Sequence, residues 1–190
     1  RLTVDGDRLF TEPAGDLESL RREHTHVAST PLPANQEIVL DEVSGNAIEI
    51  AAEIDTQDAA SLDLNVLRSP NREEFTRITF YRDRGYRDRV TMTNTPTSAI
   101  TIDSTYASIA PDVRSRAPET AHFPLPEGEN LKLRIFVDKS VVEVFVNGVQ
   151  CLALRIYPDR PDSTGVSLRA QGQAATLVSL DAWQMQNIYE

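Results

Sequence analysis

Residues 134–148 read RIFVDKSVVEVFVNG, a largely apolar stretch with two short turn signals. Asn147-Gly148 between apolar residues is a strong hairpin signal, because both residues of such a turn must accept a positive φ. Asp138-Lys139 can close a second turn in the same stretch. The sequence therefore predicts three consecutive antiparallel strands over residues 131–154.

Two-residue turns at both positions predict the register of these strands. The predicted pairs are Val146 with Val149, Val144 with Cys151, Val142 with Ala153, Glu143 with Leu152, Val137 with Ser140, Ile135 with Val142, and Leu133 with Val144. In this register Arg134 lies directly opposite Glu143, a cross-strand ion pair that contributes roughly 0.2–1 kcal/mol. A one-residue slip would invert the faces, so the agreement of the two turns supports the register.

The predicted register sorts the side chains into two faces. One face is apolar and is predicted to be core: Leu131, Leu133, Ile135, Val142, Val144, Val146, Cys151 and Ala153. The other face places Phe136, Phe145, Leu152 and Leu154 around the Arg134–Glu143 pair. Because soluble monomers seldom expose large apolar patches, we expect another domain or a second copy of the chain to cover part of this face. These four apolar residues are therefore candidate interface residues.

Length and composition limit the possible functions. A chain of 190 residues suits one large domain, and all-β sandwiches of this size are common. The formal net charge of −10 argues against nucleic acid and anionic membrane surfaces as partners. No apolar run approaches the roughly 18 residues that a membrane span needs. Cys151 is the single cysteine, so no internal disulfide can form, and we expect it to be buried and inert.

Hydrophobic periodicity predicts an all-β chain. The single helical candidate is DLESLRRE, residues 16–23, with Leu17 and Leu20 on one side. Short alternating segments separated by turn residues follow: QEIVLDEV, AIEIAAEI, SLDLNVLR, RITFYR, AITID, LKLRIFV, VVEVFV, CLALRIY, TGVSLRA and ATLVSLDAW. This pattern predicts a two-sheet antiparallel β-sandwich of the concanavalin or jelly-roll type, with a short N-terminal linker helix. The Pro-, Ser- and Thr-rich stretch 93–126 is expected to wrap an edge as a loop.

Two regions resemble glycoside hydrolase family 32, the invertases, inulinases and levanases. The opening LTVDGDRLFTEPAGDLESLR is similar to the segment that leaves the catalytic propeller in that family. The matching residues are Leu2, Gly6, Leu9, Pro13, Leu17, Leu20 and Arg21. The stretch LKLRIFVDKSVVEVFVNG, with LALRIYP and SLDAWQM after it, resembles the C-terminal β-sandwich of the same family. The resemblance implies a linker over residues 1–23 and a sandwich over residues 24–190.

The resemblance also implies a parent enzyme that hydrolyses β-fructosidic bonds with retention, using two carboxylates roughly 5–5.5 Å apart. In the family the catalytic carboxylates lie in N-D-P-N-G, R-D-P and E-C motifs on the propeller. The chain contains none of these motifs: Arg82-Asp83 and Arg87-Asp88 lack the proline, and Gln150 precedes Cys151. We therefore expect the isolated chain to have no catalytic residues, no cofactor and no fructosidase activity.

Two further groups of polar residues could form binding sites. His24 and His26 would point the same way on a strand and could form half of a metal site, but no acidic cluster of ligand spacing accompanies them, so no metal is predicted. The segment YRDRGYRDR, residues 81–89, could bind sugar through Tyr81, Arg82, Asp83 and Tyr86, since tyrosine faces and charged fixing groups make sugar-binding surfaces. A solvated hairpin whose charges pair with one another is the alternative, and it is favoured.

The sequence thus predicts the non-catalytic C-terminal β-sandwich of a bacterial β-fructosidase. Its expected partner is the catalytic propeller of the same parent chain, which it would stabilise, or a second copy of itself, with which it would dimerise. A lectin-like module that binds fructan, sucrose or another glycan by itself is the first alternative. An accessory subunit for a separately encoded propeller is the second, and the start at Arg1 instead of methionine weighs against it.

Overall fold

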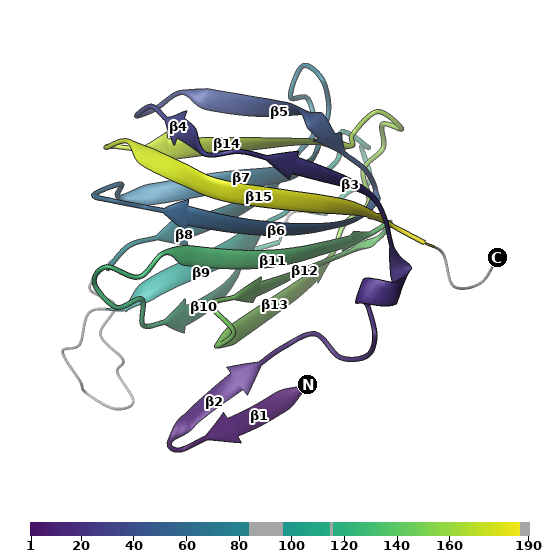
Figure 1. The fold of residues 1–190 in the computed structure, drawn as a ribbon. Coiled ribbons are helices and arrows are strands. Elements are labelled where there is room, and N and C mark those ends of the chain that lie inside the picture. The colour runs from purple at the N-terminus through teal and green to yellow at the C-terminus, as the bar shows by residue number, and fades with distance from the viewer. Residues whose placement is uncertain (84–96, 115, 187–190) are drawn as a thin grey trace.

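The computed structural model describes residues 1–83, 97–114 and 116–186, and in it two antiparallel sheets face each other (Figure 1). One sheet has six strands, in the order β10 (Glu119–Phe123), β9 (Ser98–Asp103), β8 (Thr76–Tyr81), β7 (Ser61–Arg68), β14 (Gly165–Gln171) and β5 (Glu37–Ser44). The other has the order β13 (Gln150–Arg155), β12 (Val141–Val146), β11 (Leu131–Asp138), β6 (Ala47–Asp55), β15 (Ala175–Met185) and β3 (Arg21–Val27), and β4 (Thr30–Leu32) also pairs with β15. The predicted antiparallel β-sandwich is confirmed.

The last two strands of the chain lie inside the sheets and not at their edges. Strand β14 pairs with both β5 and β7. Strand β15 pairs with β6 on one side and with β3 and β4 on the other. In each sheet, therefore, the strands that come first in the sequence (β5 in one sheet, β3 and β4 in the other) are hydrogen-bonded to the remaining strands only through β14 or β15.

The prediction of a helix over residues 16–23 is wrong. A single 3-10 turn, η1 (Glu18–Leu20), is present, and Arg21 already begins β3. A helix of eight residues is marginal in water, whereas residues of β3 gain hydrogen bonds to β15. The expected loop over residues 93–126 is also wrong in part. It contains β9, which the AITID segment predicts, and β10, which was not predicted.

The predicted core of the meander is confirmed for six residues, whose exposed fractions are 0–3%: Leu131, Leu133, Ile135, Val142, Val144 and Val146. They belong to one cluster with apolar residues of the six-stranded sheet, including Leu64, Phe80 and Ile100. The alternation of β11 and β12 therefore directs their apolar side chains between the sheets.

The first turn of the meander lies one residue later than predicted. Asp138 pairs with Val141, so Lys139 and Ser140 form the turn, and Lys139 has a φ of 52°. This moves the register by two residues and leaves every side chain on its predicted face. Arg134 lies opposite Phe145, however, and Glu143 lies opposite Phe136. The predicted cross-strand pair Arg134–Glu143 is therefore wrong.

The second turn contains one residue more than predicted. Asn147 and Gly148 have the expected positive φ values of 46° and 69°, but Val146 pairs with Gln150, which leaves Val149 outside the ladder. Because a one-residue shift reverses every side chain, Leu152 and Leu154 face the core, each with 7% exposure. Cys151 and Ala153 point outward instead. Burial of two leucines favours this register over the predicted one, which would bury a cysteine and an alanine.

A small hairpin, β1 (Leu2–Asp5) with β2 (Arg8–Thr11), lies apart from the two sheets (Figure 1). Its attachment to the sandwich includes a hydrogen bond of 2.7 Å from the Thr11 amide to the Gly148 carbonyl. The face that carries Leu2, Val4 and Leu9 is open, with exposed fractions of 68%, 70% and 53%. In the described part of the chain, no helix is long and apolar enough to cross a bilayer.

Candidate functional site

The outer face of the seven-stranded sheet is crossed by the segment that connects β2 to η1. Two grooves flank this segment, and residues Thr11, Glu12 and Pro13 line both of them, as does Phe145 of β12. One groove has a volume of about 580 Å³ and the other of about 860 Å³. The N-terminal segment therefore lies along this face of the sheet and leaves hollows on either side.

A buried carboxylate ties this segment to the sheet. Glu49 of β6 is fully buried, and its Oε2 and Oε1 accept hydrogen bonds from Arg21 Nε at 2.9 Å and Arg21 Nη2 at 2.7 Å. Arg134 Nε of β11 donates to the same Oε1 at 2.6 Å. A buried charge is tolerated when it is paired and hydrogen-bonded, and here two guanidinium groups meet one carboxylate. Arg134 thus has Glu49 as its acidic partner in place of the predicted Glu143.

The two arginines keep Glu49 ionised. Burial raises the pKa of the Glu49 carboxyl, but the hydrogen bonds and charges of Arg21 and Arg134 outweigh that effect, so its pKa lies below the usual range. The Glu49 hydrogen bond raises the pKa of Arg21 in turn. Arg21, the last residue of the linker motif, therefore connects the N-terminal segment to β6, and through Glu49 to β11.

Trp183 of β15 extends this cluster toward β3. The Arg21 guanidinium lies 4.0 Å from the centre of the Trp183 ring, and the His24 ring stacks on Trp183 at 5.1 Å. His24 Nε2 and His26 Nδ1 both hydrogen-bond Asp181 Oδ1, at 2.7 and 2.9 Å. The two histidines share a side, as their spacing predicts. No group of three or more potential metal ligands has suitable geometry among the residues that the structure describes.

Of the four predicted interface residues, two lie on this outer face. Phe136 is 9% exposed, Phe145 is half-buried, and their rings meet edge to face at 6.0 Å. Both line the larger groove together with Leu17 and Leu20. Leu152 and Leu154 were predicted here and are core residues instead, because Val149 shifts β13 by one position.

Cys151 takes one of the vacated positions on the outer face. It is half-buried and lines the larger groove, so the expectation of a fully buried cysteine is wrong. Burial raises the pKa of the Cys151 thiol, and the nearby charge of Glu143 raises it further. The thiol is therefore a weak nucleophile at neutral pH.

The structure brings together two of the four predicted sugar-binding residues. Arg82 and Asp83 line a pocket of about 600 Å³, and its other lining residues are Asp55, Gln57, Asp58, Glu127, Gly128, Glu129 and Asn130. The Arg82 guanidinium donates a hydrogen bond to Thr56 Oγ1. Tyr81 ends β8 and is not among the lining residues, and Tyr86 lies outside the described residues. Among the described residues, the pocket therefore contains the charged part of the predicted site without Tyr81.

Sequence reasoning missed Glu49, which organises the outer face. The segment AIEIAAEI carries a signal for it, since alternation puts Glu49 and Glu53 on the face opposite the core residues Ile48, Ile50 and Ile54. The pattern does not show that β6 lies between β11 and β15. This position brings Arg21 and Arg134 to the Glu49 carboxylate.

A family model described as "Glycosyl hydrolases family 32 C terminal" matches residues 16–184. Acid beta-fructofuranosidase of Vicia faba is 25% identical over 214 aligned positions, which cover 97% of the chain and 32% of that protein. Levanase of Bacillus sp. strain L7 is 29% identical over 189 positions, 98% of the chain and 19% of that protein. The crystal structure of fructan 1-exohydrolase IIa from Cichorium intybus matches with a TM-score of 0.83 at 16% identity, over 98% of the chain and 40% of that chain. The chain thus spans about a third of the first relative and less of the second.

Proposed function

The chain belongs to the family of C-terminal domains of the glycosyl hydrolases of family 32, and from this premise we propose that it is a non-catalytic sandwich that docks on and stabilises the catalytic propeller of a β-fructosidase. The observation that carries the proposal is the path of residues 11–21. This segment leaves a detached hairpin, follows the outer face of the seven-stranded sheet and ends in Arg21, whose guanidinium binds the buried Glu49.

The detached hairpin supports a partner on its open side. A two-stranded hairpin is marginally stable alone, and β1–β2 exposes Leu2, Val4 and Leu9 on one face. We infer that these residues pack against the propeller, that residues 1–23 form the linker segment, and that residues 24–190 form the sandwich. Strand β3 starts three residues before that boundary, so the linker and the sandwich share Arg21.

The grooves beside the linker support the same partner. Phe136 and Phe145 line the larger groove, and an interdomain surface tolerates the mixture of aromatic and charged groups found there. We infer that the propeller covers this groove. A second copy of the chain is the alternative occupant, and the oligomeric state of the purified chain distinguishes the two.

The lack of activity is tested directly. The purified chain is incubated with sucrose and with inulin, and we expect no release of fructose, because the chain contains none of the three carboxylate motifs. Fructose above a buffer blank contradicts the non-catalytic role. Intact mass of the protein isolated from its source tests the docking role, since a propeller in the same chain gives a mass well above 21.1 kDa.

Glycan binding by the sandwich itself is a second candidate function, and the pocket that contains Arg82 and Asp83 favours it. Carboxylates and a guanidinium group are suitable partners for sugar hydroxyls. Titration of the isolated chain with fructan oligosaccharides tests this function, and binding without hydrolysis is the expected result for a lectin-like module.

A further inference from the structure

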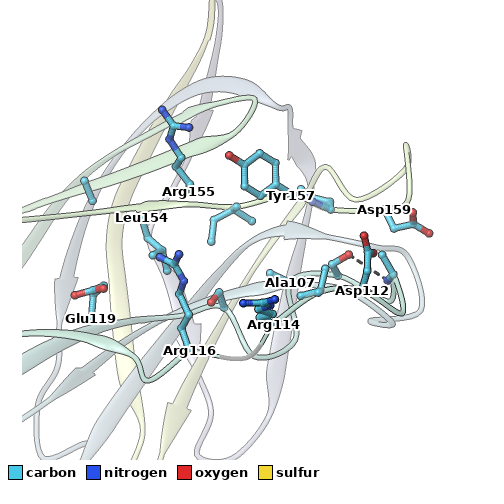
Figure 2. A pocket seen from close by; sticks show the side chains of 16 residues that line it. Ala107, Asp112, Arg114, Arg116, Glu119, Leu154, Arg155, Tyr157 and Asp159 are labelled. Atoms are coloured by element: carbon cyan, nitrogen blue, oxygen red, sulfur yellow. Dashed lines mark hydrogen bonds between the residues drawn. The ribbon is translucent and has the colours of Figure 1, made fainter.

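A separate pocket of about 820 Å³ lies at the seam where the two sheets meet edge to edge (Figure 2). Residues 153–155 of β13 and residues 156–159 after it form one wall. The other wall comes from lining residues of the connection between β9 and β10, among them Asp112, Arg114 and Arg116, and from Glu119 at the start of β10. The volume lies within the range of roughly 300–1,000 Å³ that is usual for small-molecule sites.

Glu74 holds the two walls together. This fully buried residue lies before β8, and its carboxylate accepts hydrogen bonds from the Ile109 amide at 2.8 Å and from the Asp159 and Arg160 amides at 3.0 Å each. Ser163 Oγ donates to it at 2.6 Å. One carboxylate therefore fixes both loops that border the pocket, so the pocket is built by the fold and is not a gap between loose loops.

The pocket combines apolar surface with donors and acceptors. Leu154 and Ile156, which are 7% and 1% exposed, form an apolar part of its lining, and Tyr157 presents an aromatic ring that is 58% exposed. Asp112 and Asp159 lie together at one end in Figure 2. An open aromatic ring beside fixed polar groups suits the stacking of a sugar ring.

Three arginines border the same pocket without an internal acidic partner. Arg114, Arg116 and Arg155 make no hydrogen bond or ion pair through their guanidinium groups to the described residues (1–83, 97–114 and 116–186). In Figure 2, Arg155 lies beside Tyr157, Arg116 lies beside Leu154, and Arg114 lies beside Ala107. In a chain with a net charge of −10, three unpaired guanidinium groups at one pocket are available for a ligand.

We propose that this pocket binds a neutral oligosaccharide. The three arginines are balanced by Asp112, Glu119 and Asp159 along the same lining, so the pocket as a whole does not favour an anion. Hydroxyl groups of sugars donate to carboxylates and accept from guanidinium groups, and Tyr157 stacks on a sugar ring. The proposal goes beyond the docking role and stands without it, since the pocket is lined by different residues from the grooves beside the linker.

The test is calorimetric titration of the purified chain with inulin-type and malto-oligosaccharides, with inorganic phosphate as the anionic probe. We expect binding of at least one oligosaccharide and no binding of phosphate. Tyr157→Ala and Arg116→Ala should each lower the affinity for the oligosaccharide about tenfold, because each removes roughly one stacking contact or one charged hydrogen bond. Both positions are exposed, so both variants should fold.

Phe10→Ala and Arg8→Ala, on the detached hairpin, are the matched controls and should leave the affinity unchanged. Arg82→Ala serves as a third variant for the alternative pocket. Three results overturn the proposal: no binding of either oligosaccharide, binding of phosphate alone, or a loss of affinity in Arg82→Ala without a loss in Tyr157→Ala. If the chain does not dock on a propeller, its affinity for the oligosaccharide should be unchanged, so the two proposals can be refuted independently.

Discussion

Glu49 is a residue whose surroundings, and not its sequence neighbours, give it a role. Its carboxylate is fully buried on a sheet face and is shared by arginines from the N-terminal segment and from β11. The geometry connects three segments through one acidic group, so removal of the acid leaves two cations without their partner.

We expect Glu49→Gln to lower the free energy of unfolding by about 2 kcal/mol, less than for a fully buried pair because Arg21 and Arg134 are partly exposed and can reach water. Urea unfolding followed by circular dichroism measures the change. Glu53→Gln, on the same face of the same strand and half-buried, is the control and should cost clearly less. Equal losses at both positions would contradict the role of Glu49.

Glu74 permits a second expectation at this scale. Glu74→Gln replaces one acceptor oxygen by a donor, which leaves at least one of the amide or hydroxyl donors without a partner. We expect a loss of about 1–3 kcal/mol in the free energy of unfolding, together with weaker binding in the pocket that Glu74 braces. Glu73→Gln, at the exposed neighbouring position, is the control, and the same urea unfolding experiment compares the two.

The pH dependence of stability follows from the same two carboxylates. Burial raises the pKa of Glu49 and of Glu74, but their hydrogen bonds lower both below the ordinary value of 4.5. A group whose pKa is depressed in the folded state binds its proton more readily when unfolded. Its contribution is therefore complete above pH 4.5 and is lost as the pH falls through the folded-state pKa.

We thus expect the midpoint of thermal unfolding to be nearly constant from pH 7 to about 5 and to fall below pH 4.5. Scanning calorimetry over pH 3–7 measures this. In the double variant Glu49→Gln, Glu74→Gln the decline on acidification should be shallower than in the unchanged protein. An identical slope in both proteins would mean that other groups cause the acid sensitivity.

At the scale of elements, the alternation of apolar and polar residues predicts which face of a strand is buried, but it does not predict which residues pair across neighbouring strands. The strands and the two-sheet arrangement follow from period-two apolar runs, because each run has one face that must be buried. The pairing of β12 with β13 does not follow from alternation. Whether Val149 pairs with Val146 depends on how Leu152 and Leu154 pack against the other sheet. The same applies to the predicted sugar site: alternation does not show that Tyr81 ends a strand and does not line the pocket of Arg82 and Asp83.

The register of β13 can be tested through Cys151. In the observed register its side chain lies on the outer face, half-buried, whereas the two-residue turn would place it in the core. We expect slow but complete labelling of the folded chain by iodoacetamide at pH 8.5, slow because the pKa of the thiol is raised. Mass spectrometry follows the reaction. Protection to the rate of global unfolding would indicate the other register.

At the scale of the whole molecule, the two outer faces differ in what they offer a partner. The outer face of the seven-stranded sheet carries the segment between β2 and η1, the two grooves beside it and the ring of Phe145. The six-stranded sheet carries Val39 on β5, which is 41% exposed. The variants Phe145→Ser and Val39→Ser therefore compare an apolar residue of the candidate interface with an apolar surface residue of the other sheet.

We expect Phe145→Ser to lower the thermal midpoint of the propeller-containing protein by several degrees, while Val39→Ser leaves it within about one degree. In the isolated chain the difference between the two variants should shrink, because the proposed propeller partner is absent. Sedimentation of the isolated chain completes the experiment: a dimer that Phe145→Ser dissociates would assign the groove to a second copy of the chain.

The positions of β14 and β15 have a consequence for synthesis of the chain. During translation β3, β4 and β5 leave the ribosome early, but the strands that connect them to the sheets begin at Gly165 and Ala175. Both sheets therefore remain divided until the final segment has emerged, and pairing over so long a separation in sequence is slow. A nascent chain that stops at Asp162 would expose open strand edges on both sheets, which makes early termination a route to aggregation and not to a smaller folded domain.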